Sequence, residues 1–305
     1  GDVKNQGVEL GLSWNDQIGK DFTYSVGANL AYNHNEVGSI PTEDGIIHGA
    51  TNQIYSNAEE FYRAENGHAI GYFWGFKTAG IFQNKQEIND WIAAGNGVYQ
   101  SSVQPGDVKY VDVNHDGVID AKDKVDLGNG LPKYTFGFNI NLGYKGFDLS
   151  LNATGAAGFQ IAQSYRDPNS SQSNYSRQIL NRWTGEGTSN RIPRVTYGDV
   201  GNWQFSDLYL QDGDYIRLQN ITLGYDFKRL ISWKGLSKLR LYVQAQNLFT
   251  LTKYDGMDPE IGSYNGTDGN KQNSDGTTNQ TWVSGVDMGY YPHPRTFIVG
   301  INLAF

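Results

Sequence analysis

The sequence predicts an all-β fold, specifically a segment of a transmembrane antiparallel β-barrel with long extracellular loops. Three observations lead to this class: a composition rich in glycine and aromatic residues, seven runs of alternating apolar and polar residues, and a regular exchange of short and long connections. We expect residues 1–305 to form one part of a single barrel domain.

The composition favours sheet and excludes a helical membrane protein. The 305 residues include 38 Gly, 20 Tyr, 14 Phe and 7 Trp, but only 2 Met and no Cys. Aromatic residues are enriched in strands. No stretch approaches the roughly 20 consecutive apolar residues that a membrane helix needs. A barrel stays possible, because its strands give a weaker, periodic signal.

Charge and cysteine content exclude several classes of function. A net charge of −8 without clustered Lys and Arg argues against a nucleic-acid partner. The lack of Cys removes disulfides, zinc–thiolate sites and thiol nucleophiles. The chain begins at Gly1 without a basic or apolar leader, so we expect any export signal to have been removed or to lie upstream.

Alternation is the main sequence signal, because neighbouring side chains on a strand point to opposite faces. The run 21–33 places Phe22, Tyr24 and Val26 on one face and polar or glycine residues on the other. This length suits a tilted membrane strand of roughly 9 to 11 residues. The seven expected spanning segments are 8–14, 21–33, 134–144, 147–154, 215–227, 238–249 and 295–305.

Connection lengths separate a barrel from a soluble sandwich, which also alternates. Short connections lie around 16–20, 145–146 and 228–235, whereas long ones cover about 35–133, 158–213 and 254–294. Short turns on one side and long loops on the other are typical of outer-membrane barrels, which have even strand numbers and a periplasmic C-terminus. We therefore expect an unseen strand before the first and a periplasmic C-terminus.

An Asp-rich loop within residues 105–126 is the strongest chemical motif. It offers oxygen ligands at the spacing of an EF-hand loop, with Gly117 at the turn. The predicted Ca²⁺ ligands are Asp112, Asn114, Asp116, the Val118 carbonyl, Asp120 and Asp123. Asp instead of Glu at the twelfth position resembles dockerin-type loops and should weaken binding. Alternatively, an Asx-rich turn satisfies itself with backbone hydrogen bonds and binds nothing.

Four segments resemble the C-terminal third of SusC/RagA-like TonB-dependent transporters of Bacteroidetes. They are 104–120 (QPGDVKYVDVNHDGVID), 132–139 (PKYTFGFN), 212–225 (DGDYIRLQNITLGY) and 294–305 (PRTFIVGINLAF), and 245–250 (AQNLFT) also looks like this family. The resemblance implies a barrel of about 22 strands. It also implies an N-terminal plug, a TonB-contacting segment and a SusD-like lipoprotein lid.

The resemblance implies TonB-dependent import of an oligomeric nutrient, either a glycan or a peptide, across the bacterial outer membrane. One alternative is a passive porin or adhesin barrel. Another is a soluble, calcium-dependent carbohydrate-binding β-protein. The terminal Phe305 resembles the signal read by the barrel-assembly machinery, although an aromatic residue facing lipid in the interface girdle would look the same.

No catalytic motif is evident, so we do not expect an enzyme. Gly-x-Ser-x-Gly, His-Glu-x-x-His and Cys are all missing. The carboxylates Glu59 and Glu60 are adjacent and do not indicate a glycosidase pair. Solvated or hydrogen-bonded histidines at strand ends and in loops are expected at His34, His48, His68, His115 and His293.

Aromatic residues in the long loops are candidates for contact with a ligand or lid. Tyr72, Trp74 and Trp282 could stack on sugar rings or touch a lipoprotein. The alternative is that such rings form a local core where the loops fold over one another. Polar strand residues expected to line the lumen or touch the plug are Asn139, Asn141, Gln244 and Gln246.

Overall fold

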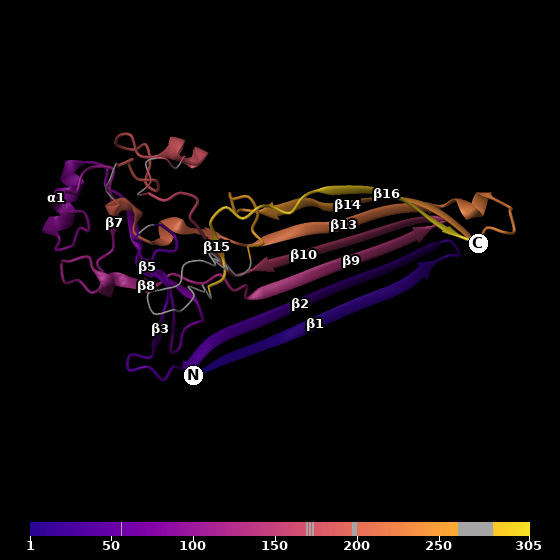
Figure 1. Ribbon diagram of the computed structural model, residues 1–305, viewed down its shortest axis with the longest axis horizontal. Coiled ribbons are helices and arrows are strands. Elements are labelled where there is room, and N and C mark those ends of the chain that lie inside the picture. The colour runs from indigo at the N-terminus through magenta and orange to yellow at the C-terminus, as the bar shows by residue number, and fades with distance from the viewer. Residues whose placement is uncertain (56, 169, 171, 173, 197–199, 262–282) are drawn as a thin grey trace.

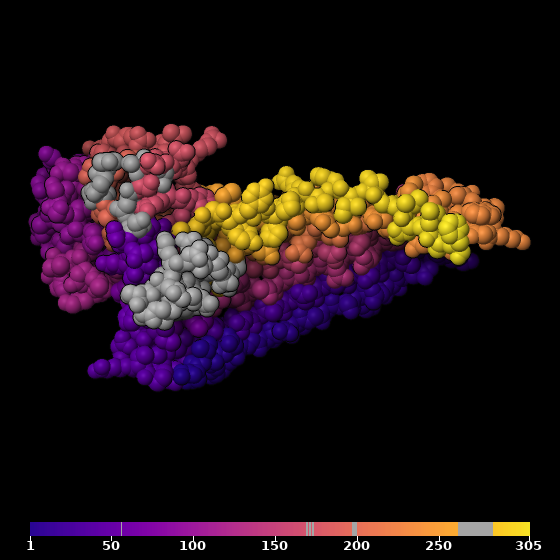
Figure 2. Space-filling model, in the orientation of Figure 1, coloured from indigo at the N-terminus to yellow at the C-terminus, as the bar shows by residue number. Residues whose placement is uncertain are grey.

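The computed structural model describes all residues except 56, 169, 171, 173, 197–199 and 262–282. A long sheet projects from a bulky head, which is built from the long connections between the strands (Figures 1 and 2). The N-terminus lies at the head end of the sheet and the C-terminus at the opposite end (Figure 1).

Seven antiparallel strands form the large sheet. In sheet order they are β1 (Asp2–Ile18), β2 (Phe22–Ser39), β9 (Tyr134–Tyr144), β10 (Phe147–Ala157), β13 (Tyr215–Asp226), β14 (Lys238–Thr252) and β16 (Thr296–Ala304). Each corresponds to one predicted segment, so the predicted all-β class is confirmed. The first segment, 8–14, was predicted too short at both ends. In the described chain the sheet is open, with β1 and β16 at its edges.

Connection length divides the two ends of the sheet as predicted. The turns 19–21, 145–146 and 227–237 lie at one end, and the last contains the 3₁₀ helix η5 (Phe227–Leu230). The described parts of the connections 40–133, 158–214 and 253–295 lie at the other end (Figure 1). Lys145 and Gly146 both have positive φ, at 48° and 94°, as a two-residue hairpin turn requires.

The strand register sorts side chains into an apolar and a polar face. One transverse row on the apolar face contains Trp14, Val26, Ile140, Leu151, Ile221, Ala245 and Phe297. The adjacent row on the opposite face contains Ser13, Gly27, Asn139, Asn152, Asn220, Gln246 and Thr296. A one-residue slip in any strand would exchange the two sets, so the register is strongly specified.

The apolar face is uncovered along the sheet. Val299 is 81% exposed and Val8 is 70% exposed. Aromatic residues gather at both ends of this face: Tyr32 lies 5.2 Å from Tyr134 near the head, and Phe147 lies 4.4 Å from Tyr225 near the short turns, measured between ring centroids. An exposed apolar band between aromatic girdles is the outer surface of a membrane barrel.

A β-bulge at Gln219 interrupts the alternation of β13. Pairing passes from Leu218 directly to Asn220 on both neighbouring strands, which leaves Gln219 outside the register. The extra residue reverses which positions face each side. Arg217 therefore lies on the polar face, although Ile221 and Leu223 lie on the apolar one.

Short elements build the head. Its strands are β3 (Ile46–His48), β4 (Tyr62–Glu65), β5 (Tyr72–Phe76), β6 (Thr78–Ile81), β7 (Val108–Tyr110), β8 (Lys124–Asp126), β11 (Gln160–Gln163), β12 (Leu210–Asp212) and β15 (Val286–Asp287). Its helices are α1 (Lys85–Ala93) and the 3₁₀ helices η1 (Ala121–Asp123), η2 (Arg177–Asn181), η3 (Gly201–Trp203) and η4 (Asp207–Tyr209). Among the described residues, no helix is long and apolar enough to cross a membrane.

The head has a hydrophobic core of its own. Its largest cluster joins Phe61, Tyr62 and Phe73 to Phe205 from a distant connection, with Phe61 and Phe205 4.9 Å apart between ring centroids. A second cluster surrounds Phe76 and includes strands β6 and β7. The three long connections therefore pack into one another.

Candidate functional site

The Asp-rich loop folds around its own carboxylates. The Asp112 side chain accepts hydrogen bonds from the backbone N–H of Gly117 at 2.8 Å and of Asp116 at 3.2 Å. The Asp116 side chain accepts from Val118 N–H at 2.9 Å. Gly117, predicted at the turn, has a φ of 82°, which glycine adopts without strain.

The end of this loop is held by a capping box at η1. The Asp120 side chain accepts from Lys122 N–H at 2.8 Å, while Asp123 accepts from Asp120 N–H at 2.9 Å. Asp123 also accepts from Val113 N–H at 2.8 Å and thereby joins the two ends of the loop. Burial opposes ionisation of Asp112, but the backbone donors led by Gly117 outweigh it and lower the pKa of this carboxyl.

The predicted calcium ligands share one loop but do not converge as a set of acidic ligands. In the part of the chain that the structure describes, the one group of three acidic or histidine side chains with ligand atoms within 4.8 Å is Asp258, Glu260 and His293, which lies elsewhere. The loop carboxylates instead point at backbone amides, as in the Asx-rich alternative. Calcium binding stays a prediction.

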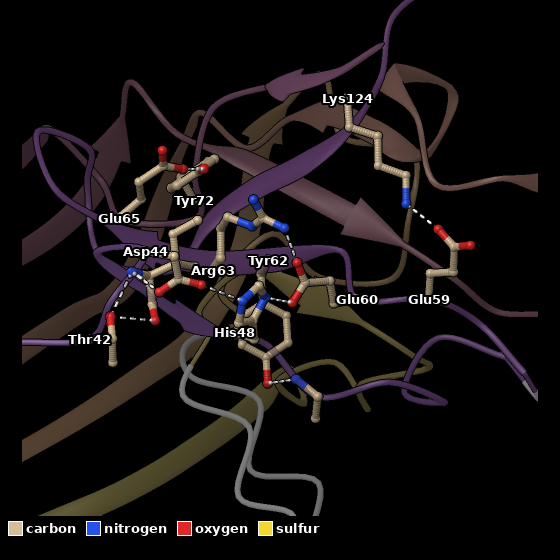
Figure 3. A network of polar contacts seen from close by, with 12 residues as sticks. Thr42, Asp44, His48, Glu59, Glu60, Tyr62, Arg63, Glu65, Tyr72 and Lys124 are labelled. Atoms are coloured by element: carbon tan, nitrogen blue, oxygen red, sulfur yellow. Dashed lines mark hydrogen bonds and ion pairs between the residues drawn. The ribbon is translucent and has the colours of Figure 1, made fainter. Parts of the chain in front are cut away.

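Tyr72 and Trp74 lie on β5, and Tyr72 belongs to the polar network of Figure 3. Tyr72 is only 2% exposed, and its hydroxyl donates to Glu65 at 2.5 Å. The Trp74 ring is half-buried, with the Arg63 guanidinium 3.3 Å and the Lys124 ammonium 4.6 Å from its centroid. These contacts fix both rings within the head, and their predicted contact with a ligand or lid stays untested. Trp282 lies outside the described residues.

His48 links two carboxylates at the edge of the same network (Figure 3). Its Nδ1 lies 2.8 Å from Glu60 Oε2, and its Nε2 lies 3.2 Å from Asp44 Oδ2. Glu60 also accepts a hydrogen bond from Arg63. Partial burial works against the charged imidazole, but the hydrogen bonds to Glu60 and Asp44 outweigh it and raise the pKa of His48.

Arg217 forms the centre of a second cluster, at the head end of the polar face. This buried guanidinium donates to Thr250 Oγ1 at 3.0 Å, to Glu260 at 2.8 Å and to Asp258. His293 donates its backbone N–H to Asp258 at 3.0 Å. The carboxylates thus already have a cation between them, so the cluster is a structural ion network. The sequence analysis did not predict this cluster, although an Arg inside a predicted membrane strand indicates that an acidic partner lies nearby.

The polar face carries the predicted lining residues. Asn139 and Asn141 lie on β9, and Gln244 and Gln246 lie on β14, all on the face opposite to the apolar band. Asn141 accepts a hydrogen bond from Ser150 on the adjacent strand at 2.8 Å. A charged contact near the short turns joins Arg240 to Asp148, with Nε 2.8 Å from Oδ1.

Phe305 follows the last strand at the short-turn end of the sheet. It is 80% exposed, and its ring meets Trp233 edge to face at a centroid distance of 6.0 Å. Its predicted part in barrel assembly is not tested by this geometry.

A cavity of about 580 Å³ opens in the head, and sequence reasoning did not predict it. Its walls come from the end of β11 and the residues after it, from η2, η3 and η4, from residues 191–193, from β12 and from the segment after β14. No local signal could have found it, because these segments are far apart in the sequence.

A sheet with an apolar outer and a polar inner face, joined to a folded head, defines a segment of an outer-membrane-type barrel. No protein-family model matches the chain. Along its whole length it is 30% identical to TonB-dependent receptor P3 of Formosa agariphila and 27% identical to TonB-dependent receptor SusC of Bacteroides thetaiotaomicron. The chain spans 29% and 27% of these two relatives.

Solved structures show the same fold. The RagAB peptide importer in its open-open state matches 99% of this chain with a TM-score of 0.67 and 21% identity, and the chain covers 29% of that protein. The closed-closed state gives a TM-score of 0.68 at 22% identity, and the chain covers 30% of it. The predicted resemblance is confirmed: over its whole length, the chain is similar to TonB-dependent receptors of the SusC/RagA kind.

Proposed function

We propose that this chain forms the C-terminal wall and outer head of a transporter that imports an oligomeric nutrient across the bacterial outer membrane in a TonB-dependent manner. The observation that carries the proposal is the match of the entire chain to curated TonB-dependent receptors. The two-faced sheet supports it, because a transporter wall needs lipid on one side and an aqueous or plugged lumen on the other. The protein acts as a conduit and not as an enzyme.

The lengths of the turns support a proposed orientation. Long loops lie outside the cell in barrels of this type, and short turns lie in the periplasm. We therefore propose that the head is extracellular and that the end at Phe305 is periplasmic. In this position the head can receive the nutrient and contact a SusD-like lipoprotein lid. One solved relative is described as a peptide importer, which keeps a peptide beside a glycan as the cargo.

The test is nutrient uptake by cells that carry the full-length receptor containing this chain. Loss of TonB should abolish uptake to the same extent as loss of the receptor, because the plug that the family resemblance implies would keep the cargo from diffusing through the barrel. Uptake that persists without TonB would favour the passive porin. A tagged receptor should also co-purify with a SusD-like lipoprotein from detergent extracts, and an adhesin would not need one.

Phe305 is proposed to assist recognition by the barrel-assembly machinery. Replacing Phe305 with Ala should reduce the amount of heat-modifiable, folded receptor in the outer membrane. Val299→Ala is the matched control, because it removes a lipid-facing apolar side chain from the same terminal segment. Equal loss in both variants would assign Phe305 to the aromatic girdle alone.

Calcium is proposed as a structural ion of the Asp-rich loop. Hydrogen exchange of residues 112–123 in the purified receptor should slow when calcium replaces EDTA, because a bound ion would fix the carboxylates. Asp116→Ala should remove this response, whereas Asp90→Ala, on helix α1, should leave it intact. Exchange that is identical with calcium and EDTA would establish the self-satisfied turn.

A further inference from the structure

The head cavity combines aromatic planes with hydrogen-bonding side chains. Tyr165, Tyr175, Trp203 and Tyr209 contribute rings to its walls. The Arg166 guanidinium lies 4.0 Å from the centroid of the Tyr175 ring. Amides from Gln163, Gln178, Asn181 and Gln211 also line it. A volume of about 580 Å³ is in the range that holds a small ligand or the end of a larger one.

The two carboxylates of the cavity are already engaged by the protein. Asp255 accepts a hydrogen bond from the Gln178 side chain. Asp212 Oδ1 accepts from the Asp214 backbone N–H at 3.0 Å. Neither forms an ion pair with a described residue, but both have part of their hydrogen-bonding capacity filled.

Two of the three cationic side chains that line the cavity, Arg191 and Lys253, have most of their hydrogen-bond donors unused by the described residues. Among the described residues, the Arg191 guanidinium makes a single long hydrogen bond, from Nη2 to the Leu210 carbonyl at 3.4 Å. Within the described chain, the Lys253 ammonium forms no hydrogen bond or ion pair. An arginine with a free planar fork is suited to a carboxylate, which it can bind through two parallel hydrogen bonds.

We infer that this cavity binds a carboxylate group of the imported oligomer, with Arg191 and Lys253 as the anion-binding side chains and the tyrosine rings as the surface for the rest of the terminal unit. The inference rests on the proposed import function and specifies its substrate class as acidic. A uronic acid unit and a peptide C-terminus share this chemistry.

Two pairs of probe molecules distinguish a uronic acid from a peptide C-terminus as the source of the carboxylate. The glycan pair is tri-galacturonate and its fully methyl-esterified form, and the peptide pair is N-acetyl-trialanine and its C-terminal amide. Binding of each to the detergent-purified, full-length receptor is measured by calorimetry. In one pair the acid should bind at least about tenfold more tightly than its neutral form, the size of a charge-assisted hydrogen bond.

Variants assign this preference to the cavity. Arg191→Gln and Lys253→Gln should each weaken binding of the acid about tenfold and leave the neutral form unchanged. Lys234→Gln, which removes the same charge at the short-turn end of the sheet, should change neither. Circular dichroism and heat-modifiable migration confirm that each variant is folded.

Three results would overturn the inference: equal affinity for acid and neutral probes, no binding of either acid, or variants that weaken both members of a pair alike. None of these would touch the import function, because TonB-dependent uptake is measured separately in cells. Conversely, an acid preference that is lost in the Arg191 and Lys253 variants would stand even if uptake proved independent of TonB.

Discussion

The membrane sheet and the head use the same aromatic and aliphatic residues in opposite ways. On the sheet, Val8 and Val299 point away from the protein and are more than two-thirds exposed. In the head, Phe61 and Phe73 are almost completely buried. The surrounding medium, and not the residue type, therefore decides whether an apolar side chain points away from the protein or into its core.

Charge follows the same division. The head buries charges in pairs, such as Asp107 with Arg194, whose Nε lies 2.6 Å from Oδ1. The apolar band of the sheet is nearly free of charges, and the polar face carries mainly amides and hydroxyls. The Arg240 and Asp148 pair is the exception near the short turns. Where the head buries a carboxylate without an opposite charge, as at Asp112 and Asp123, backbone N–H groups donate to it instead.

The largest effect is expected when the same type of substitution, Phe to Ala, is made once in the head and once on the sheet. Phe73→Ala should destabilise the head by about 3–5 kcal/mol, because it removes a fully buried ring and leaves a cavity. Phe138→Ala, on the lipid face, should cost clearly less. Urea unfolding of the full-length receptor, followed by hydrogen exchange in head and sheet, measures both. Equal losses would contradict the division into two media.

A charge on the apolar face tests the membrane side of the comparison. Ile140→Arg should destabilise the barrel by about 2–4 kcal/mol, because this row lies near the middle of the apolar band. The neighbouring Asn141→Arg places the same group on the polar face and should be tolerated better. The folded fraction of each variant is measured after refolding into lipid vesicles. A lower folded fraction for Asn141→Arg than for Ile140→Arg would mean that the two faces are wrongly assigned.

The Arg217 cluster should make the head end of the sheet sensitive to acid. Burial opposes ionisation of Asp258, but hydrogen bonds from Glu260, His293 and Arg217 outweigh it and lower the pKa of this carboxyl. The stabilisation is therefore complete above its ordinary pKa of about 4 and is lost as the pH falls further. The protection of residues 253–261 against hydrogen exchange, corrected for the intrinsic rate at each pH, should fall below pH 4, and Asp258→Asn should remove most of this change. Protection that stays constant in acid would contradict the ion network.

The smallest effect is expected at His48, on the exposed edge of the head. Because its pKa is raised on folding, its stabilising contacts are complete below pH 6.5 and are lost as the pH rises through the higher folded value. Proteolysis near residues 42–48 should become faster between pH 6 and 8, and His48→Gln should flatten the profile. His34→Gln, near the head end of β2, is the control that should leave the profile unchanged.

The strands could be predicted because each carries its own signal. Two different media impose a period of two on every strand, and a reader of 134–144 needs no information from elsewhere in the chain. The ends were less predictable: in β1, residues 2–7 are mostly polar and show little alternation, yet they pair with β2 up to Ser39. Backbone hydrogen bonds to β2 extend the strand there, beyond the apolar pattern.

The candidate sites were less predictable because they depend on distant partners. The Asp112 loop was visible since its ligands are neighbours in sequence, whereas Arg217 meets Asp258 and His293 only through folding. The expected hydrogen-bonded histidines are seen at His48 and His293, but their partners could not be named beforehand. The head cavity also required the packing of segments that share no local pattern.

The bulge at Gln219 divides β13 into two parts with opposite alternation. After Gln219, odd-numbered residues lie on the apolar face, and before it even-numbered residues do. One inserted residue therefore lets residues 215–218 and residues 220–226 place their side chains on the two faces independently. Deletion of Gln219 would restore regular pairing with β10 and leave Arg217 on the polar face, whereas pairing Gln219 into the register of the neighbouring strands would turn Arg217 towards the apolar face.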